Sequence, residues 1–270
     1  MPQNGLHGLF GLGVARVVAP RLLAQQRQSA AVPFVTGTTL GAMLPDVDMY
    51  PTAIVFLMGR GDLIYVMHRT ATHSVFLVLL LTIIGVLLLR LRRGRRPVTG
   101  WACLGLALGM STHILLDTFF WFAQIDLFWP LSHLPAEQPL LPILDLWQGA
   151  KLDPLVVNLR EAGEFAAFAL LLRALRHIAA RQEESAPGVS PRSLNRWETA
   201  AWVGFGVALV GAVLFRDAPK FQNVLVTAPS LLAFLPFCWL SVYRLRHALA
   251  HWACGQSREK VVLSTEGVRR

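Results

Sequence analysis

Seven histidines and aspartates stand inside apolar stretches of the N-terminal half of this sequence. Two lie in LPDVD, two in HRTATHS, two in HILLD and one near the N-terminus: Asp46 and Asp48, His68 and His73, His113 and Asp117, and His7. An ionisable side chain in a membrane-like segment costs several kcal/mol unless it is paired, solvated or bound to metal. Imidazole and carboxylate together are the ligand set of hydrolytic zinc and manganese sites. The set therefore predicts a metal centre.

The spacing within two of the motifs shows how their side chains can converge. His113 and Asp117 are four residues apart, so on a helix they lie about 40° apart on one face and can share a metal. Asp46 and Asp48 are two residues apart and would diverge on an intact helix. Pro45 removes a helix hydrogen bond and disfavours helix in the residue before it. We expect a break there that turns both carboxylates toward one centre.

The HRTATHS motif requires a different arrangement, because His68 and His73 are five residues apart and one regular helix would splay them. Its threonines and the serine that ends it are good helix N-caps, so we expect one histidine in a loop and the other on the first turn of the next helix. Arg69 can bind an anionic substrate group through two hydrogen bonds. Each residue alone also fits a simpler role, as a cap, a turn former or an interfacial histidine.

The composition excludes a water-soluble globule. Apolar residues make up 54% of the 270 residues, against roughly 45–50% in soluble domains, and charged residues 15%, against about 25%. The mean hydropathy is +0.49. Disordered, fibrous and disulfide-scaffold classes are excluded too, and Cys103, Cys238 and Cys254 lack the spacing of a zinc or redox site. We therefore expect an all-α, polytopic helical membrane protein.

The apolar blocks predict about six or seven helical segments. The clearest transmembrane span is 74–89, which ends at an arginine run. The other segments are 6–24, 32–58 with its break at Pro45, 101–123, 165–180, and the pair 199–215 and 224–243, which would form a transmembrane hairpin. The proline- and tryptophan-rich stretch 127–158 suggests an interfacial loop. Glu161 and Glu164 then head a helix, where the helix dipole alone favours a carboxylate.

We divide the chain into a site-bearing membrane core, 1–180, a polar linker, 181–197, and a hairpin with a basic cytoplasmic tail, 198–270. The net charge of +9 comes from bases clustered between or after apolar blocks. This pattern is typical of membrane topology rather than of nucleic-acid binding, so no nucleic-acid partner is expected. If the spans alternate, the positive-inside rule places the metal site on the extracytoplasmic side and the C-terminus in the cytoplasm.

The series LPDVD, HRTATHS, HILLD and WPLS resembles the YdjM-like family of LexA-regulated, inner-membrane-associated proteins, which are predicted metal-dependent hydrolases. The resemblance covers residues 4–135, and LPDVD with HRTATHS is its specific part. The N-terminal histidine block of the family looks like Leu6-His7-Gly8, with Leu6 where the family usually has threonine. No counterpart is found for the hairpin after Arg196. The order of ligands is also similar to that of zinc-dependent phospholipases C and P1-type nucleases, which act on phosphodiesters.

These observations favour a membrane-bound metal-dependent hydrolase that acts at the bilayer interface on a phosphoester or lipid-linked substrate. The expected cofactor is a divalent metal, with zinc favoured and manganese as the alternative. A carboxylate that is not fully committed to the metal, Asp48, would act as base, and Arg69 would bind a phosphate oxygen. A metal-ion or proton-coupled transporter is the alternative function, because intramembrane histidines and aspartates also mark ion pathways. A haem-binding or purely structural protein fits less well, since the aspartates suit a harder metal.

Overall fold

The computed structural model describes residues 4–23, 28–60, 68, 70–91, 98–118, 125–131, 154–181, 189–215, 226 and 228–255. All regular secondary structure in these residues is helical, which confirms the all-α class. The α-helices are α1 (Asn4–Leu22), α2 (Gln28–Gly41), α3 (Met49–Leu57), α5 (Val75–Leu91), α6 (Val98–Leu116), α7 (Pro154–Ala180), α8 (Pro191–Leu214), α10 (Leu235–Arg244) and α11 (Arg246–Ala253). Shorter turns are η1 (Pro45–Asp48), η3 (Ala71–His73) and the π-helical η6 (Ser230–Phe234).

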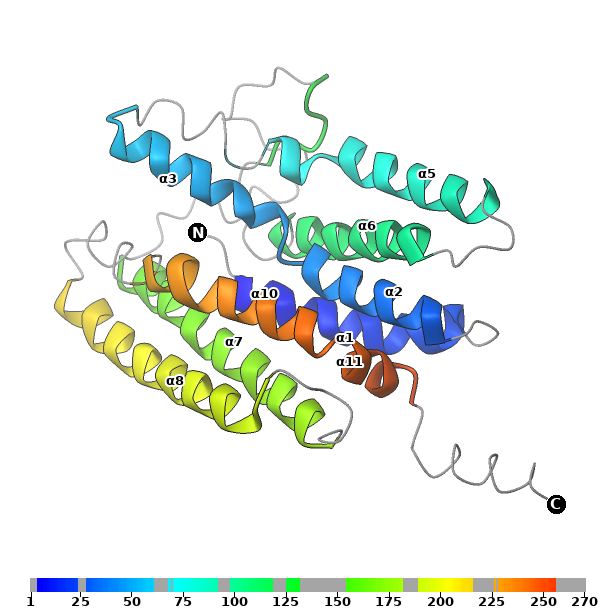
Figure 1. The fold of residues 1–270 in the computed structure, drawn as a ribbon. Helices are drawn as coiled ribbons and strands as arrows, with labels where there is room; N and C mark the ends of the chain where they lie inside the picture. The colour runs from blue at the N-terminus through cyan, green and yellow to red at the C-terminus, as the bar shows by residue number, and fades with distance from the viewer. Residues whose placement is uncertain are drawn as a thin grey trace.

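Neighbouring helices form a row through the molecule in the order α5, α6, α2, α1, α7 and α8 (Figure 1). Helices α10 and α11 lie against this row and contact both α2 and α7. By length and apolar composition, α6 and α8 are the helices of the described part that could cross a membrane. Helix α5, which occupies the span expected at 74–89, and the segment Ser230–Arg244 are apolar but shorter.

Helices α2 and α6 pack backbone to backbone through two glycines on each helix. These are Gly37 and Gly41 on α2, and Gly105 and Gly109 on α6. A Cβ on Gly109 would lie 2.2 Å from the carbonyl oxygen of Thr38, and a Cβ on each of the other three would lie within 2.7 Å of a backbone oxygen across the contact. Glycines four residues apart let helices approach closely where the surrounding lipid supplies no hydrophobic force. This contact brings the C-terminal end of α6, which carries His113, to the end of α2.

The apolar stretch 32–58 is broken as expected, although the break begins earlier than the proline. Helix α2 ends at Gly41, and Pro45 opens the 3₁₀ turn η1, which continues directly into α3. Thr52 in α3 donates a hydrogen bond of 2.7 Å to the carbonyl oxygen of Asp48. The break therefore leaves Asp46 and Asp48 on a short, tightly wound turn between two helices.

Two helices, α7 and α8, begin eight or more residues earlier than the sequence suggests. Helix α7 starts at Pro154 rather than at residue 165, because proline is well suited to the first turn of a helix. Glu164 therefore lies in the interior of α7, and the dipole of its own helix does not explain it. Helix α8 starts at Pro191, inside the stretch expected to be a linker, and Ser190 caps it by accepting a hydrogen bond from the Ser193 amide at 3.1 Å.

The segments on both sides of the expected linker contribute to one apolar core. Phe234 of η6 stacks on Phe168 of α7, with ring centroids 5.4 Å apart. Near the other end of the molecule, the guanidinium of Arg16 donates a hydrogen bond of 2.6 Å to the carbonyl oxygen of Ala253. The division of the chain at 181–197 stays a prediction about sequence organisation, since the packing continues across it.

Candidate metal centre

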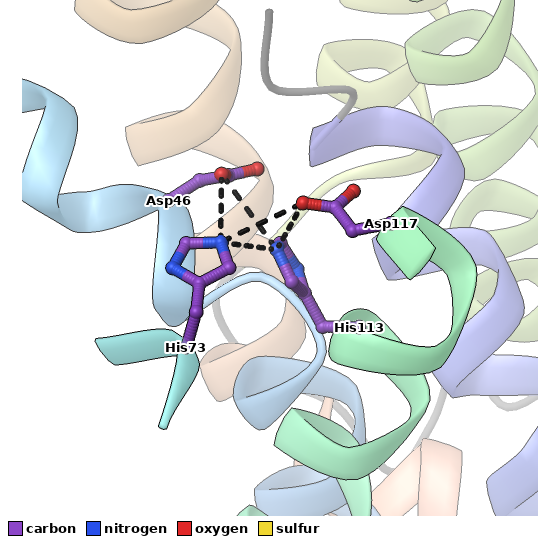
Figure 2. A group of neighbouring side chains, drawn as sticks. All are labelled: Asp46, His73, His113 and Asp117. Carbon is purple, nitrogen blue, oxygen red and sulfur yellow. Dashed lines mark hydrogen bonds and ion pairs between the residues drawn. The ribbon is translucent and has the colours of Figure 1, made fainter. Parts of the chain in front are cut away.

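Asp46, His73, His113 and Asp117 converge on one buried point (Figure 2). One possible ligand atom from each residue lies within 4.8 Å of the others, and none of the four residues is more than 2% exposed. They come from η1, η3, the last turn of α6 and the residue just after α6. Segments separated by up to 71 residues thus supply one four-residue group.

Five of the six distances between the possible ligand atoms are close to those of a tetrahedral metal site. The two Nε2 atoms of His73 and His113 are 3.2 Å apart. Asp46 Oδ1 lies 3.8 Å and 3.7 Å from them, and Asp117 Oδ2 lies 3.6 Å from each. Bonds of about 2.0–2.1 Å from zinc to four tetrahedral ligands would place neighbouring ligand atoms about 3.3 Å apart. The carboxylates of Asp46 and Asp117 offer oxygens within 4.8 Å of each other, so a modest approach of these two side chains would let all four donors hold a small divalent ion.

Asp46 shows why this position suits a cation. Neither of its carboxylate oxygens has a hydrogen-bond partner in the described part of the chain, and its side chain is fully buried. A buried polar group without a partner requires an explanation, such as an ion or an ordered water. Its nearest ring nitrogens are those of the two histidines of the group. A metal ion held by the four residues would satisfy Asp46.

His113 is held in the tautomer that binds a metal. Its Nδ1 lies 2.8 Å from the carbonyl oxygen of Ala42. Because a carbonyl only accepts, Nδ1 carries the hydrogen and donates it, which leaves the lone pair of a neutral ring on Nε2. Nε2 is the atom that faces the group. Ala42 follows the last residue of α2, so the close packing of α2 and α6 sets this orientation.

His73 is oriented in the same way by a hydroxyl. Thr72 Oγ1 donates a hydrogen bond of 2.7 Å to Asp48 Oδ2, so its oxygen is left to accept from His73 Nδ1 at 3.1 Å. The lone pair of His73 therefore also lies on Nε2, toward the group.

His7 contacts the group from its outer side. Its Nε2 lies 3.0 Å from Asp117 Oδ1, the oxygen that does not face the other histidines. Its ring stacks on that of His113 at 3.7 Å with an interplanar angle of 23°. His7 is fully buried. It is placed to hold Asp117 and His113 in position, and its role as a direct ligand stays a prediction.

Asp48 and His68 form a separate pair on the opposite side of His73. Asp48 Oδ1 lies 2.7 Å from His68 Nδ1, and Asp48 Oδ2 lies 3.7 Å from His73 Nδ1. A 3₁₀ turn has three residues per turn, so side chains two apart diverge by about 120°. The structure thus departs from the expectation that Asp46 and Asp48 face one centre, because they flank the two nitrogens of one imidazole. Ligand roles for Asp48 and His68 stay predictions.

Two residues that orient the histidines of the group, Thr72 and Ala42, were not predicted from the sequence as orienting residues. Arg69 lies outside the described residues. Sequence reasoning treated Thr72 only as a helix cap, although a hydroxyl residue directly before a ligand histidine is a possible orienting partner. It also missed the carbonyl of Ala42, whose position directly before a helix break was the available signal, since the last carbonyls of a helix lack partners within it.

One of three comparisons with known proteins identifies a family that contains this chain. No curated protein and no solved structure matches the chain. The sequence model of the YdjM inner membrane protein family matches residues 1–185. The matched region contains all four residues of the group and the helices α1 to α7, while α8 to α11 follow it. Because the match covers more than half of the 270 residues, the chain belongs to the YdjM inner membrane protein family.

Proposed function

We propose that this inner membrane protein is a metal-dependent hydrolase with zinc as its favoured metal. The observation that carries the proposal is the buried group of Asp46, His73, His113 and Asp117, whose nitrogen and oxygen donors lie within 4.8 Å of one another. Imidazole with carboxylate and without thiolate suits zinc or manganese. A bound divalent ion would supply Lewis-acid chemistry, polarising the scissile group and making a water molecule acidic.

The residues around the group have the chemistry that hydrolysis needs. Asp48 is outside the four-residue group, and its Oδ1 lies against His68, with which it would share a proton. His68, which it contacts at 2.7 Å, is less buried than the ligand candidates, with a side chain that is 13% exposed. The pair could therefore hold and pass a proton between the centre and the partly exposed ring of His68. Arg69, next to His68 in the chain, would bind a phosphate oxygen of the substrate.

The proposed substrate is a phosphoester, in particular a lipid-linked one. The centre lies at the ends of helices in an inner membrane protein, so a substrate held in the bilayer would reach it from the interface. The charge pattern of the sequence supports an extracytoplasmic site with a cytoplasmic C-terminus. A transporter would instead require a continuous polar path across the membrane, whereas the group is compact and closed by buried side chains.

Two measurements on protein purified gently without chelator test this proposal. We expect close to one equivalent of zinc or manganese by elemental analysis, and less than about 0.3 equivalents would contradict tight metal binding. We also expect hydrolysis of phosphodiester lipids in mixed micelles, with activity lost on chelation and restored by metal.

Matched variants assign that hydrolysis to the centre. Asp117→Asn should abolish turnover while the protein still inserts and folds. Glu198→Gln removes a carboxylate that is also buried but pairs with Arg176 of α7 at 2.8 Å, and it should leave turnover unchanged. Wild-type turnover in Asp117→Asn would show that the reaction occurs elsewhere.

A further inference from the structure

Glu164 is a buried acid in α7 that the proposed chemistry does not use. It is 2% exposed and lies in the interior of its helix. Its Oε1 accepts a hydrogen bond from the backbone amide of Gly5 at 3.3 Å, and its Oε2 has no hydrogen-bond partner in the described residues. Burying a carboxylate is costly, so a function for this side chain is expected.

The partner of Glu164 is the beginning of α1. The first amides of a helix have no acceptor within the helix, and a carboxylate that accepts from them is also favoured by the helix dipole. Gly5 belongs to this first turn, since α1 begins at Asn4. Glu164 therefore caps a helix that lies 159 residues away in the sequence.

The backbones of α1 and α7 touch at this cap. A Cβ on Gly5 would lie 2.5 Å from the backbone nitrogen of Phe168, so the first turn of α1 rests directly on α7. Three residues further along, a Cβ on Gly8 would lie 2.8 Å from side-chain atoms of Leu171 and of Met43. The start of α1 is thus fixed in position by α7, with Glu164 as the polar contact.

His7 belongs to the same end of α1. It is two residues beyond Gly5, and its ring lies against His113 and Asp117 of the metal centre. The terminal turns of helices fray when their amides are not capped. A displacement of this turn would therefore move His7 away from Asp117 Oδ1, to which its Nε2 is 3.0 Å.

We propose that Glu164 is a positioning residue for the metal centre, acting through His7. It caps the first turn of α1, and the capped turn holds His7 against Asp117 and His113. The inference rests on the proposed metal binding. Through Glu164, α7 would support the metal centre indirectly, since none of the four residues of the metal group lies on that helix. The family match continues to residue 185 and includes α7.

The experiment measures the binding of Co²⁺ to the full-length protein in detergent, because the visible spectrum of Co²⁺ reports its ligand geometry. Glu164→Met removes the acceptor but keeps an apolar side chain of similar length, and Glu164→Ala serves as a second variant without an acceptor. We expect Co²⁺ affinity to fall about 10–100-fold, as for other partners of metal ligands, with a changed spectrum. Glu164→Gln retains an amide oxygen that can accept from Gly5 and should restore both.

A double-mutant cycle with His7→Ala separates positioning from general stabilisation. If Glu164 acts through His7, the double variant should bind Co²⁺ like His7→Ala alone. Glu198→Ala, which removes the buried carboxylate that pairs α8 with Arg176, is the matched control. It should lower the unfolding temperature without changing Co²⁺ affinity or spectrum. Hydrogen exchange of the first turn of α1 should quicken in Glu164→Met and not in the control.

Each contrary result has a distinct meaning. A wild-type protein that binds no Co²⁺ overturns the proposed metal centre and this inference with it. Wild-type binding together with unchanged affinity and spectrum in Glu164→Met overturns only this inference. Additive effects of Glu164→Met and His7→Ala overturn the route through His7. Should Glu164→Met and Glu164→Ala both fail to fold, Glu164→Gln decides. Impaired Co²⁺ binding in Glu164→Gln overturns the positioning role of Glu164, because the hydrogen bond from Gly5 would be intact in that variant.

Discussion

Replacing Asp46 by asparagine changes the charge of the centre while keeping its shape. The two side chains have nearly the same volume, and neither oxygen of Asp46 makes a hydrogen bond in the described residues. The substitution therefore breaks no hydrogen bond in the metal-free protein. It does convert a charged donor, 3.7–3.8 Å from both histidine Nε2 atoms, into a weak neutral one. We expect a loss of metal-dependent stability without a loss of metal-free stability.

The size of this effect follows from linkage. A metal that binds only the folded state adds about 4.1 kcal/mol to the free energy of unfolding when its free concentration is 1,000 times Kd. Removing an outer partner of a ligand already weakens binding about 10–100-fold, and Asp46 is a direct ligand candidate, so 100-fold is a lower bound. That factor equals about 2.8 kcal/mol. At about 2–4 °C per kcal/mol for a chain of this size, the metal-dependent rise in Tm should shrink by at least about 5–11 °C.

The assay is thermal unfolding in detergent micelles, followed by the fluorescence of the 8 tryptophans. Wild type, Asp46→Asn and the control Glu198→Gln are compared in chelator and in excess Zn²⁺. The control should lose stability in both conditions and keep its rise with Zn²⁺, since its ion pair with Arg176 lies outside the centre. An equal rise with Zn²⁺ in wild type and Asp46→Asn would refute the assignment of Asp46 as a ligand.

Three further predictions concern orientation, packing and topology. Thr72→Val removes the acceptor of the 3.1 Å contact with its neighbouring histidine and should weaken zinc binding about 10–100-fold in competition with a chromophoric chelator, whereas Thr72→Ser should bind normally. Gly109→Ala should lower the free energy of unfolding by about 1–3 kcal/mol, because its Cβ would lie 2.2 Å from a backbone oxygen. Gly13→Ala, with no atom within 4 Å, should not destabilise the protein in the same denaturation series. In a variant without the native cysteines, Arg69→Cys should react with an impermeant maleimide in intact cells and Gly94→Cys should not, and the reverse pattern would turn the site toward the cytoplasm.

The sequence was sufficient to identify the helical membrane class and to predict seven candidate metal ligands, among which are the four residues that the structure groups. Long apolar blocks predict helices, and charges within such blocks stand out because lipid does not solvate them. The i, i+4 spacing of His113 and Asp117 is a local property of one helix, and the structure brings both into the group. Pro45 likewise predicted a break that is found in the fold. Such inferences succeed because they depend on neighbouring residues alone.

Contacts between distant segments were decided only by the tertiary structure. Asp46 and Asp48 face opposite sides of His73 because the break is a 3₁₀ turn, whose winding the sequence pattern does not specify. The hydrogen bond of His113 to Ala42, 71 residues away, depends on the close approach of α2 to α6. Glu164 caps a helix 159 residues distant. Sequence periodicity describes one helix at a time, whereas the orientation of side chains in a metal centre is fixed by the packing of several helices. The sequence therefore predicted which residue types could bind a metal, but not how their side chains are oriented.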